Sequence, residues 1–237
     1  LYPGVESPLA GRRAGDIDLV VVRENTEGEY AQSGGFIYHQ QPHEIAIQTS
    51  VFTRRGIERV VRFAFELAVR RNKKRRLTSI TKSNAQGYSM VLWDRVVAAV
   101  AQECPSVETD SQLVDAAAMN FVRRPESFDV VVASNLFGDI LSDLSAIVTG
   151  SIGLAPSANL DPTRRHPSLF EPVHGSAPDI AGRGIANPMA AILSAAMLLE
   201  HLECVPAARA IEAAVTAVLA EGRVRTPDLG GDSSTQQ

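Results

Sequence analysis

The sequence predicts an α/β protein with a largely parallel or mixed sheet, because short apolar runs alternate with amphipathic segments. Residues 17–22 and 130–132 are nearly continuous apolar runs, as expected of strands that are covered on both faces. Between them lie longer segments whose apolar residues recur at helical spacing. This alternation favours strands joined by crossover helices over an all-α or all-β chain.

Two further segments have the pattern of strands. Residues 77–80 form a short apolar run. Residues 44–51 alternate instead, with Ile45 and Ile47 on one face, so we expect a half-exposed strand there. With residues 36–38 just before it, this segment is expected to form a hairpin or a clasp-like arm.

The expected helices each have a recognisable start or stop. Thr53 is a candidate N-cap for a long helix with apolar positions at Ile57, Val60, Val61, Ala64, Leu67 and Ala68. The other helices are expected over residues 88–103, from near Phe137, from Asn187-Pro188 with proline at the first helical position, and over residues 207–220 with Gly222 as the stop.

Composition excludes several classes of function. Lys+Arg 23 against Asp+Glu 27 gives a formal net charge of −4, so there is no broad basic surface for nucleic acid. No apolar run reaches the roughly 18 residues that a membrane span needs. Cys104 and Cys204 are too few for a disulfide framework and lack the spacing of a zinc site. We therefore expect a globular cytoplasmic protein that contacts neither nucleic acid nor membrane.

Three aspartates are candidate metal ligands. Asp139 and Asp143 follow the strand at residues 130–132 and lie four apart, so they share a helix face. Two like charges there repel unless a cation lies between them, and carboxylate oxygens suit Mg²⁺ or Mn²⁺. On spacing alone, two exposed helix carboxylates explain the pair equally well. Asp115 follows strand-like residues, and could be a helix N-cap or the third ligand of such a site.

Three other side chains are candidates for binding and proton transfer. Arg23 ends the first strand, where a guanidinium can bind a substrate carboxylate through two hydrogen bonds. Tyr30 could donate a proton, although a lone tyrosine is more often a packed ring with a wet hydroxyl. Lys82 follows the strand at residues 77–80; beside a metal ion and an arginine it is a candidate general base, and without them a surface lysine.

Residues 170–179 (FEPVHGSAPD) form a candidate nucleotide-binding loop. Its small residues allow backbone amides to approach a nucleotide closely. Asp179 could accept hydrogen bonds from ribose hydroxyls and would repel a 2′-phosphate, or it could be an ordinary loop carboxylate. Neither GxGxxG nor GxxxxGK[ST] is present, so neither a standard Rossmann fingerprint nor a P-loop is supported.

Taken together, these segments resemble the β-decarboxylating dehydrogenases, the family of isocitrate and isopropylmalate dehydrogenases. The motifs that carry the resemblance are residues 22–30 (VRENTEGEY), 81–84 (TKSN), 135–143 (NLFGDILSD) and 171–179 (EPVHGSAPD), in that order through nearly the whole chain. Within the family, residues 23–30 and 48–56 look most like tartrate/D-malate dehydrogenases. Residues 115–119 and 181–196 look more like isopropylmalate dehydrogenases.

The resemblance implies a role for each candidate residue. Arg23 would bind substrate carboxylate, Tyr30 would be the general acid, and Lys82 would help deprotonate the substrate hydroxyl. Asp115, Asp139 and Asp143 would bind Mg²⁺ or Mn²⁺, with Lys82 and Asp115 contributed by the partner subunit of a homodimer. The implied NAD-binding residues are Asn84, Glu171, His174, Gly175, Ser176, Ala177, Asp179 and Asn187. Asp179 matches the acid of NAD-using members.

The implied function is NAD- and metal-dependent oxidative decarboxylation of a small 2-hydroxy diacid, with D-malate or tartrate as the leading substrate. 3-Isopropylmalate dehydrogenase is the alternative, and a non-catalytic regulatory subunit is the alternative outside enzymes. The implied architecture is the isopropylmalate dehydrogenase-like two-domain fold. Residues 1–149 would form the central dimerisation domain with the substrate and metal residues, and residues 150–237 the C-terminal part of the cofactor domain. Family members have an opening βα segment before the position of Leu1, so we expect a fragment that is inactive alone.

Overall fold

The computed structural model describes residues 1–237, which divide into two compact units. One unit comprises residues 19–141, and the other comprises residues 1–18 together with 142–237. The expected domain boundary lay between residues 149 and 150. In the structure, residues 1–18 and 142–149 are instead part of the same unit as residues 150–237. The N-terminal residues join the second unit because Tyr2 and Val5 pack against its apolar cluster.

The unit of residues 19–141 is built on a four-stranded parallel sheet in the order β1-β6-β4-β5. The strands are β1 (Val20–Arg23), β4 (Arg76–Thr81), β5 (Glu108–Leu113) and β6 (Val130–Ala133). β6 is buried along its whole length, as its apolar run predicted. All four strands run in the same direction, so their carboxyl ends meet at one edge of the sheet.

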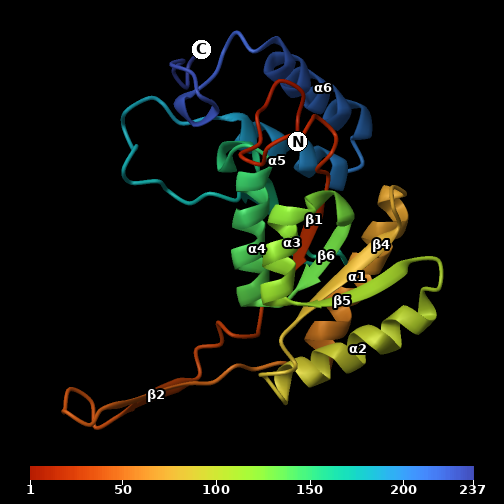
Figure 1. The fold of residues 1–237 in the computed structure, drawn as a ribbon, viewed down its shortest axis with the longest axis vertical. Helices are drawn as coiled ribbons and strands as arrows, with labels where there is room; N and C mark the ends of the chain where they lie inside the picture. Colours follow the sequence, from red (N-terminus) through yellow and green to blue (C-terminus); the bar gives the residue numbers. More distant parts are fainter. The chain divides into compact units, whose positions relative to one another are not determined.

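Helices connect these strands (Figure 1). They are α1 (Arg54–Arg71), α2 (Ser89–Glu103), α3 (Val114–Arg123) and the short η1 (Pro125–Ser127), followed after β6 by α4 (Asn135–Val148), which continues into the second unit. Thr53 is the N-cap of α1, as predicted, and its side chain accepts a hydrogen bond from the Gly56 N–H. α1 buries Phe65 in addition to most of the expected apolar positions, whereas Leu67 is only partly buried.

The core of this unit lies between the sheet and the helices α1 and α2, which pack on each other and on β4. Trp93 of α2 is fully buried, and its indole N–H donates a hydrogen bond to the Ser79 hydroxyl at 2.9 Å. A buried indole N–H that lacked an acceptor would cost free energy, so this contact allows the largest side chain of the core to be buried on a strand that carries a serine.

Strands β2 (Gly34–Ile37) and β3 (Ile45–Gln48) form an antiparallel hairpin, seen in Figure 1 as an arm that extends from the rest of this unit. The hairpin was expected, but a half-buried strand was wrong: every residue of both strands is exposed. Alternation predicts an apolar face, and in the single chain no other element of the unit covers that face.

The second unit contains η2 (Ile152–Leu154), the antiparallel pair β7 (Pro156–Asn159) and β8 (Leu169–Pro172), α5 (Met189–His201), α6 (Val205–Glu221) and η3 (Pro227–Leu229). Leu154, Leu193, Val215 and Leu219 form its apolar cluster. Gly222 ends α6 in the left-handed conformation with φ 66°, as predicted. None of the helices of the chain combines the length and the apolar character that a bilayer crossing requires.

Candidate active site

Arg23, Tyr30 and Asp139 form a cluster at the carboxyl ends of β1 and β6. These two strands are neighbours, and Arg23 is paired in register with Ala133, so Arg23 and the start of α4 lie at the same sheet edge. The Arg23 Nη1 lies 2.5 Å from Asp139 Oδ1, and the Tyr30 hydroxyl donates to Asp139 Oδ2 at 2.9 Å. The Arg23 guanidinium carbon also lies 5.7 Å from the centre of the Tyr30 ring. The structure thus brings together three of the predicted site residues.

The environment of Tyr30 favours its neutral form. The hydrogen bond to Asp139 is the largest cause that raises the pKa of the phenol above its ordinary value, with smaller contributions from desolvation and from the Asp139 charge. The Arg23 charge opposes them. Tyr30 is 49% exposed, so it is neither deeply buried nor packed as an ordinary core ring. A phenol that keeps its proton in an accessible position fits the predicted role of a proton donor.

Lys82 and Asp115 form a second cluster at the same sheet edge. They follow β4 and β5, which are adjacent parallel strands with Thr81 in register with Leu113. The Lys82 Nζ lies 2.7 Å from Asp115 Oδ1. This hydrogen bond, followed by backbone hydrogen bonds from Asp115 and Ala116, lowers the pKa of the Asp115 carboxyl.

Asp115 is not an N-cap in this structure. The N-cap of α3 is Leu113, and Asp115 lies in the first turn of the helix. Its carboxylate still interacts favourably with the helix N-terminus there. Its side chain is 59% exposed, and that of Lys82 is 27% exposed. The pair therefore remains accessible from outside the chain.

The structure does not test the three predicted metal ligands together. No group of three or more His, Cys, Asp or Glu side chains is arranged to hold a metal ion. Asp139 and Asp143 both lie in α4, four residues apart, but Asp143 belongs to the second unit, so its position relative to Asp139 stays a sequence prediction.

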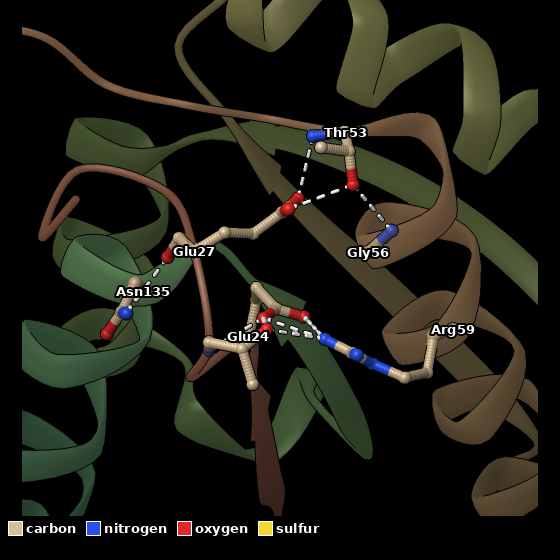
Figure 2. A network of polar contacts seen from close by, with 7 residues as sticks. Glu24, Glu27, Thr53, Gly56, Arg59 and Asn135 are labelled. Atoms are coloured by element: carbon tan, nitrogen blue, oxygen red, sulfur yellow. Dashed lines mark hydrogen bonds and ion pairs between the residues drawn. The ribbon is translucent and has the colours of Figure 1, made fainter. Parts of the chain in front are cut away.

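The glutamates between Arg23 and Tyr30 fix the course of this segment (Figure 2). Glu24 is 2% exposed and accepts hydrogen bonds from Arg59 of α1 at 3.0 Å. The Glu27 carboxylate accepts from the Thr53 N–H at 2.7 Å and from the Thr53 hydroxyl at 2.8 Å, at the start of α1. These contacts tie the segment to the helix that follows the arm.

Glu29 binds the other neighbouring helix. Its carboxylate accepts from the Ser134 hydroxyl at 2.6 Å and from the Leu136 N–H at 3.1 Å, at the start of α4. A carboxylate at this place satisfies helix N–H groups that have no partner within the helix, and complements the positive end of the helix dipole. The acidic residues of the segment are therefore structural supports on both sides of Arg23.

Asn135 and Gly138 also contact Arg23, although the sequence pattern did not predict a role for either residue. Asn135 accepts hydrogen bonds from two nitrogens of Arg23, and Gly138 lies against the Arg23 stem. A signal for Asn135 existed in the sequence, since it is a polar residue just beyond a buried strand. Gly138 had no such signal, because its contact with Arg23 depends on the path of the Arg23 side chain over α4, which only the tertiary structure shows.

The predicted cofactor residues lie in two places. Asn84 is exposed in the turn after β4, in the unit of residues 19–141. The others lie in the second unit, where Glu171 is in β8 and accepts from Asn159 at 3.3 Å, and where Gly175, Ser176 and Asp179 are exposed in the following loop. In that loop His174 Nδ1 lies 3.0 Å from the Gly175 carbonyl, and Ala177 has a φ of +43°, a backbone conformation that non-glycine residues seldom adopt.

The predicted start of α5 was wrong by one residue: Pro188 is the N-cap and not the first helical residue, and Asn187 precedes it. The helix begins at Met189, and the Asn187 Oδ1 accepts a hydrogen bond from the Met189 N–H at 3.0 Å. Its Nδ2 donates to Asp228 Oδ2 at 3.0 Å, and the residue is 9% exposed. The side chain of Asn187 is thus engaged within the chain and fixes the start of the helix.

Comparison with known proteins agrees with the motifs. A profile of the isocitrate/isopropylmalate dehydrogenase family matches residues 2–237. The chain is 55% identical to the D-malate dehydrogenase [decarboxylating] of Escherichia coli (strain K12) and 54% identical to the tartrate dehydrogenase/decarboxylase of Pseudomonas putida. Each alignment covers 100% of this chain and 66% of the relative, so the chain spans slightly less than two thirds of these proteins.

Two further matches extend the range of similar proteins. The chain is 57% identical over 221 residues to a 3-isopropylmalate dehydrogenase of Frankia casuarinae, an alignment that covers 93% of this chain and 64% of that protein. The crystal structure of an isocitrate dehydrogenase from Methylococcus capsulatus superposes with a TM-score of 0.90 at 43% identity, over 99% of this chain and 68% of that one. The predicted fold is therefore confirmed.

Proposed function

Because this chain belongs to the isocitrate/isopropylmalate dehydrogenase family, we propose that it forms the substrate- and metal-binding part of an oxidative decarboxylase. The proposed substrate is a small 2-hydroxy diacid, with D-malate or tartrate leading, and the proposed cofactors are NAD and Mg²⁺ or Mn²⁺. The observation that carries the proposal is the cluster of Arg23, Tyr30 and Asp139, which combines a carboxylate-binding cation, a proton donor and a metal-type ligand at one sheet edge.

Arg23 supplies the recognition of substrate. Its guanidinium has five N–H donors, and three of its nitrogens each make a hydrogen bond to Asn135 or Asp139. One N–H on each terminal nitrogen remains for a ligand. Two such donors match the two oxygens of a carboxylate.

The donor set at Asp139 suits a hard divalent cation. Carboxylate oxygens are the ligands that Mg²⁺ and Mn²⁺ prefer, and Asp139 is 46% exposed in its side chain although Arg23 contacts it. Asp139, Asp143 and a partner's copy of the Asp115 position would hold the ion. Bound there, a divalent cation supplies Lewis-acid stabilisation of oxygen atoms on which negative charge develops.

Lys82 is the proposed proton acceptor of the reaction, and Tyr30 is the proposed proton donor. Lys82 accepts the proton of the substrate hydroxyl, and a bound NAD would supply the hydride acceptor for the carbon that carries this hydroxyl. The carbon–carbon bond to the β-carboxylate then breaks, CO₂ departs, and its bonding electrons remain on the substrate as an enolate. Tyr30 donates its proton to the enolate carbon that carried the departing CO₂. It can do so because its hydrogen bond to Asp139 favours the protonated phenol.

The proposed site is shared between two copies of the chain. Two observations support a homodimer. Lys82 and Asp115 are paired and accessible, yet do not complete a metal site within their own chain. The arm also exposes Phe36, Ile37, Tyr38, Ile45 and Ile47 by 45% to 63%, which is more apolar surface than an isolated hairpin is expected to leave in water. We propose that the arm of a second copy of the chain covers these exposed side chains.

NAD is the proposed cofactor because of Asp179. The exposed carboxylate in the loop after β8 would accept hydrogen bonds from ribose hydroxyls and repel a 2′-phosphate. We therefore expect Asp179→Lys to shift the ratio of kcat/KM for NAD to that for NADP toward NADP. Glu203→Lys, an exposed acid outside the loop, is the matched control and is expected to leave the ratio unchanged.

3-Isopropylmalate is the second candidate substrate. It is favoured by the 57% identity to a 3-isopropylmalate dehydrogenase. The two candidates differ at the distal substituent of the substrate, so a direct comparison of substrates separates them.

The deciding experiment follows NADH formation and CO₂ release by the full-length protein with Mn²⁺ and NAD. The substrates are D-malate, tartrate and 3-isopropylmalate. We expect the highest kcat/KM with D-malate or tartrate. Turnover of 3-isopropylmalate alone would reject the leading substrate, and no turnover of any of the three would reject the proposed reaction.

A further inference from the structure

We propose that Asn135 is the positioning residue that orients Arg23 toward the substrate. This inference rests on the proposed substrate-binding role of Arg23. Asn135 is the first residue of α4 and is 5% exposed. Its side-chain oxygen accepts hydrogen bonds from Arg23 Nε at 3.0 Å and from Arg23 Nη2 at 2.7 Å.

One acceptor on two nitrogens fixes the plane of the guanidinium. The Nε and Nη2 N–H groups point to the same side of the fork, so a single oxygen that binds both sets the rotation of the group about its last bonds. Asp139 Oδ1 accepts a hydrogen bond from Arg23 Nη1 at 2.5 Å. With both contacts made, the free N–H groups on Nη1 and Nη2 have a defined direction, which a long arginine side chain on its own does not have.

Asn135 itself is held in one orientation. Its Nδ2 donates to the Glu27 carbonyl oxygen at 3.0 Å, a contact drawn in Figure 2. A carbonyl oxygen can only accept a hydrogen bond, so the amide nitrogen of Asn135 faces Glu27 and the amide oxygen faces Arg23. Gly28 follows with a φ of +99°, and a Cβ there would lie 3.3 Å from the Asn135 Cβ, so the backbone approaches this side chain closely.

Gly138 provides the space for the Arg23 stem. A Cβ at position 138 would lie 2.6 Å from Arg23 Cγ and 2.8 Å from Arg23 Cβ. These atoms are near the backbone end of the side chain and have little freedom to move. Arg23 therefore lies across the first turn of α4, on a glycine, with Asn135 next to its guanidinium.

The test compares variants of the full-length protein. Asn135→Leu removes the acceptor, whereas Asn135→Asp keeps an oxygen toward Arg23, loses the donor to Glu27 and adds a negative charge. Binding of D-malate in the presence of Mn²⁺ is measured by calorimetry, and KM and kcat are measured for D-malate and for NAD. The double variant Arg23→Met/Asn135→Leu is compared with Arg23→Met.

We expect Asn135→Leu to weaken D-malate binding and to lower kcat/KM for D-malate by about 10- to 100-fold, the effect of losing hydrogen bonds to a charged group, with an unchanged KM for NAD. Asn135→Asp is expected to recover most of this loss. In the double variant, Asn135→Leu is expected to add nothing, because Asn135 acts through Arg23.

Two outcomes would overturn the inference. One is a folded Asn135→Leu protein that binds D-malate as the parent does. The other is an equal loss from Asn135→Leu whether or not Arg23 is present. If Asn135→Leu does not fold, Gly138→Ala decides, since it displaces the Arg23 stem, and parental D-malate binding by that variant would overturn the inference. If the parent acts on tartrate or 3-isopropylmalate and not on D-malate, the same comparison is made with that substrate. A parent that binds one of the three without turning any of them over would reject the proposed reaction but leave this test intact, whereas a parent that binds none of the three overturns both.

Discussion

Arg23 and Asp139, 116 residues apart in the chain, form an ion pair at 2.5 Å at the carboxyl ends of two adjacent strands. The substrate-binding cation and the metal-binding carboxylate of the proposed site thus neutralise each other. A metal ion that binds Asp139 therefore competes with Arg23, and an Arg23 that gives up this partner has three N–H groups for a substrate carboxylate instead of two.

The first prediction follows from this competition. Arg23→Met is expected to increase the Mn²⁺ affinity of the full-length protein in the absence of substrate, roughly fivefold, because a partly exposed ion pair of about 1 kcal/mol no longer opposes the ion. Mn²⁺ titration measures it. Arg62→Met is the matched control, since Arg62 pairs with Glu58 and Glu103 and not with Asp139, and should leave the affinity unchanged. Equal or weaker Mn²⁺ binding by Arg23→Met would contradict the competition.

The second prediction concerns the pH at which Tyr30 ionises. Because Asp139 raises the pKa of its phenol, Tyr30 is expected to ionise above the ordinary pKa of a tyrosine. The stability that it contributes is fully present below that ordinary value and is lost as the pH rises through the raised one. Alkaline difference spectra of the metal-free protein, with Tyr30→Phe to identify the signal, measure this. Asp139→Asn should lower the Tyr30 pKa toward its ordinary value. A Tyr30 that ionises at the same pH in the parent as in Asp139→Asn would exclude the hydrogen bond.

The third prediction tests whether two subunits share each site. Tyr30→Phe and Lys82→Met homodimers are each expected to have low activity. If Lys82 acts in the site of the partner subunit, a hybrid dimer has one site with both residues intact, so mixing under subunit exchange restores about a quarter of parental activity. Activity that stays at the level of the two separate variants would place Lys82 and Tyr30 of one chain in the same site. Mixing Tyr30→Phe with Tyr30→Phe/Lys82→Met is the control and should restore nothing.

The fourth prediction concerns the support of the segment between Arg23 and Tyr30. A Cβ at Gly56 would lie 2.3 Å from Glu27 Oε1, so Gly56→Ala displaces the carboxylate from the start of α1. Glycine to alanine inside a helix ordinarily stabilises by up to about 1 kcal/mol, but here we expect a loss of about 1 kcal/mol in the free energy of unfolding, comparable to loss of an N-cap. Urea unfolding measures it. Gly87→Ala, with open space around the new Cβ, is the control and should be close to neutral. A more stable Gly56→Ala protein would show that Glu27 is not needed at this helix end.

Local patterns were sufficient for most elements of the fold. Thr53 and Gly222 were predicted as helix boundaries because a cap is a property of a few neighbouring residues. The arm at residues 34–48 was predicted as a hairpin, but its burial was wrong, since burial depends on what covers a face and not on the alternation that creates it.

The sequence by itself determined the α/β class, the strand and helix positions, and the kinds of side chain that follow each strand. Only the tertiary structure decided which of these side chains meet. The strand order β1-β6-β4-β5 places Arg23 beside Asp139 and Lys82 beside Asp115, and separates the two pairs. The physical reason is that a contact between residues far apart in the chain depends on strand order and register, which the pairing of whole elements sets. Arg23 also packs on Gly138 and binds Asn135, both in the first turn of α4. These contacts likewise depend on the pairing of β1 with β6, which no local sequence pattern sets.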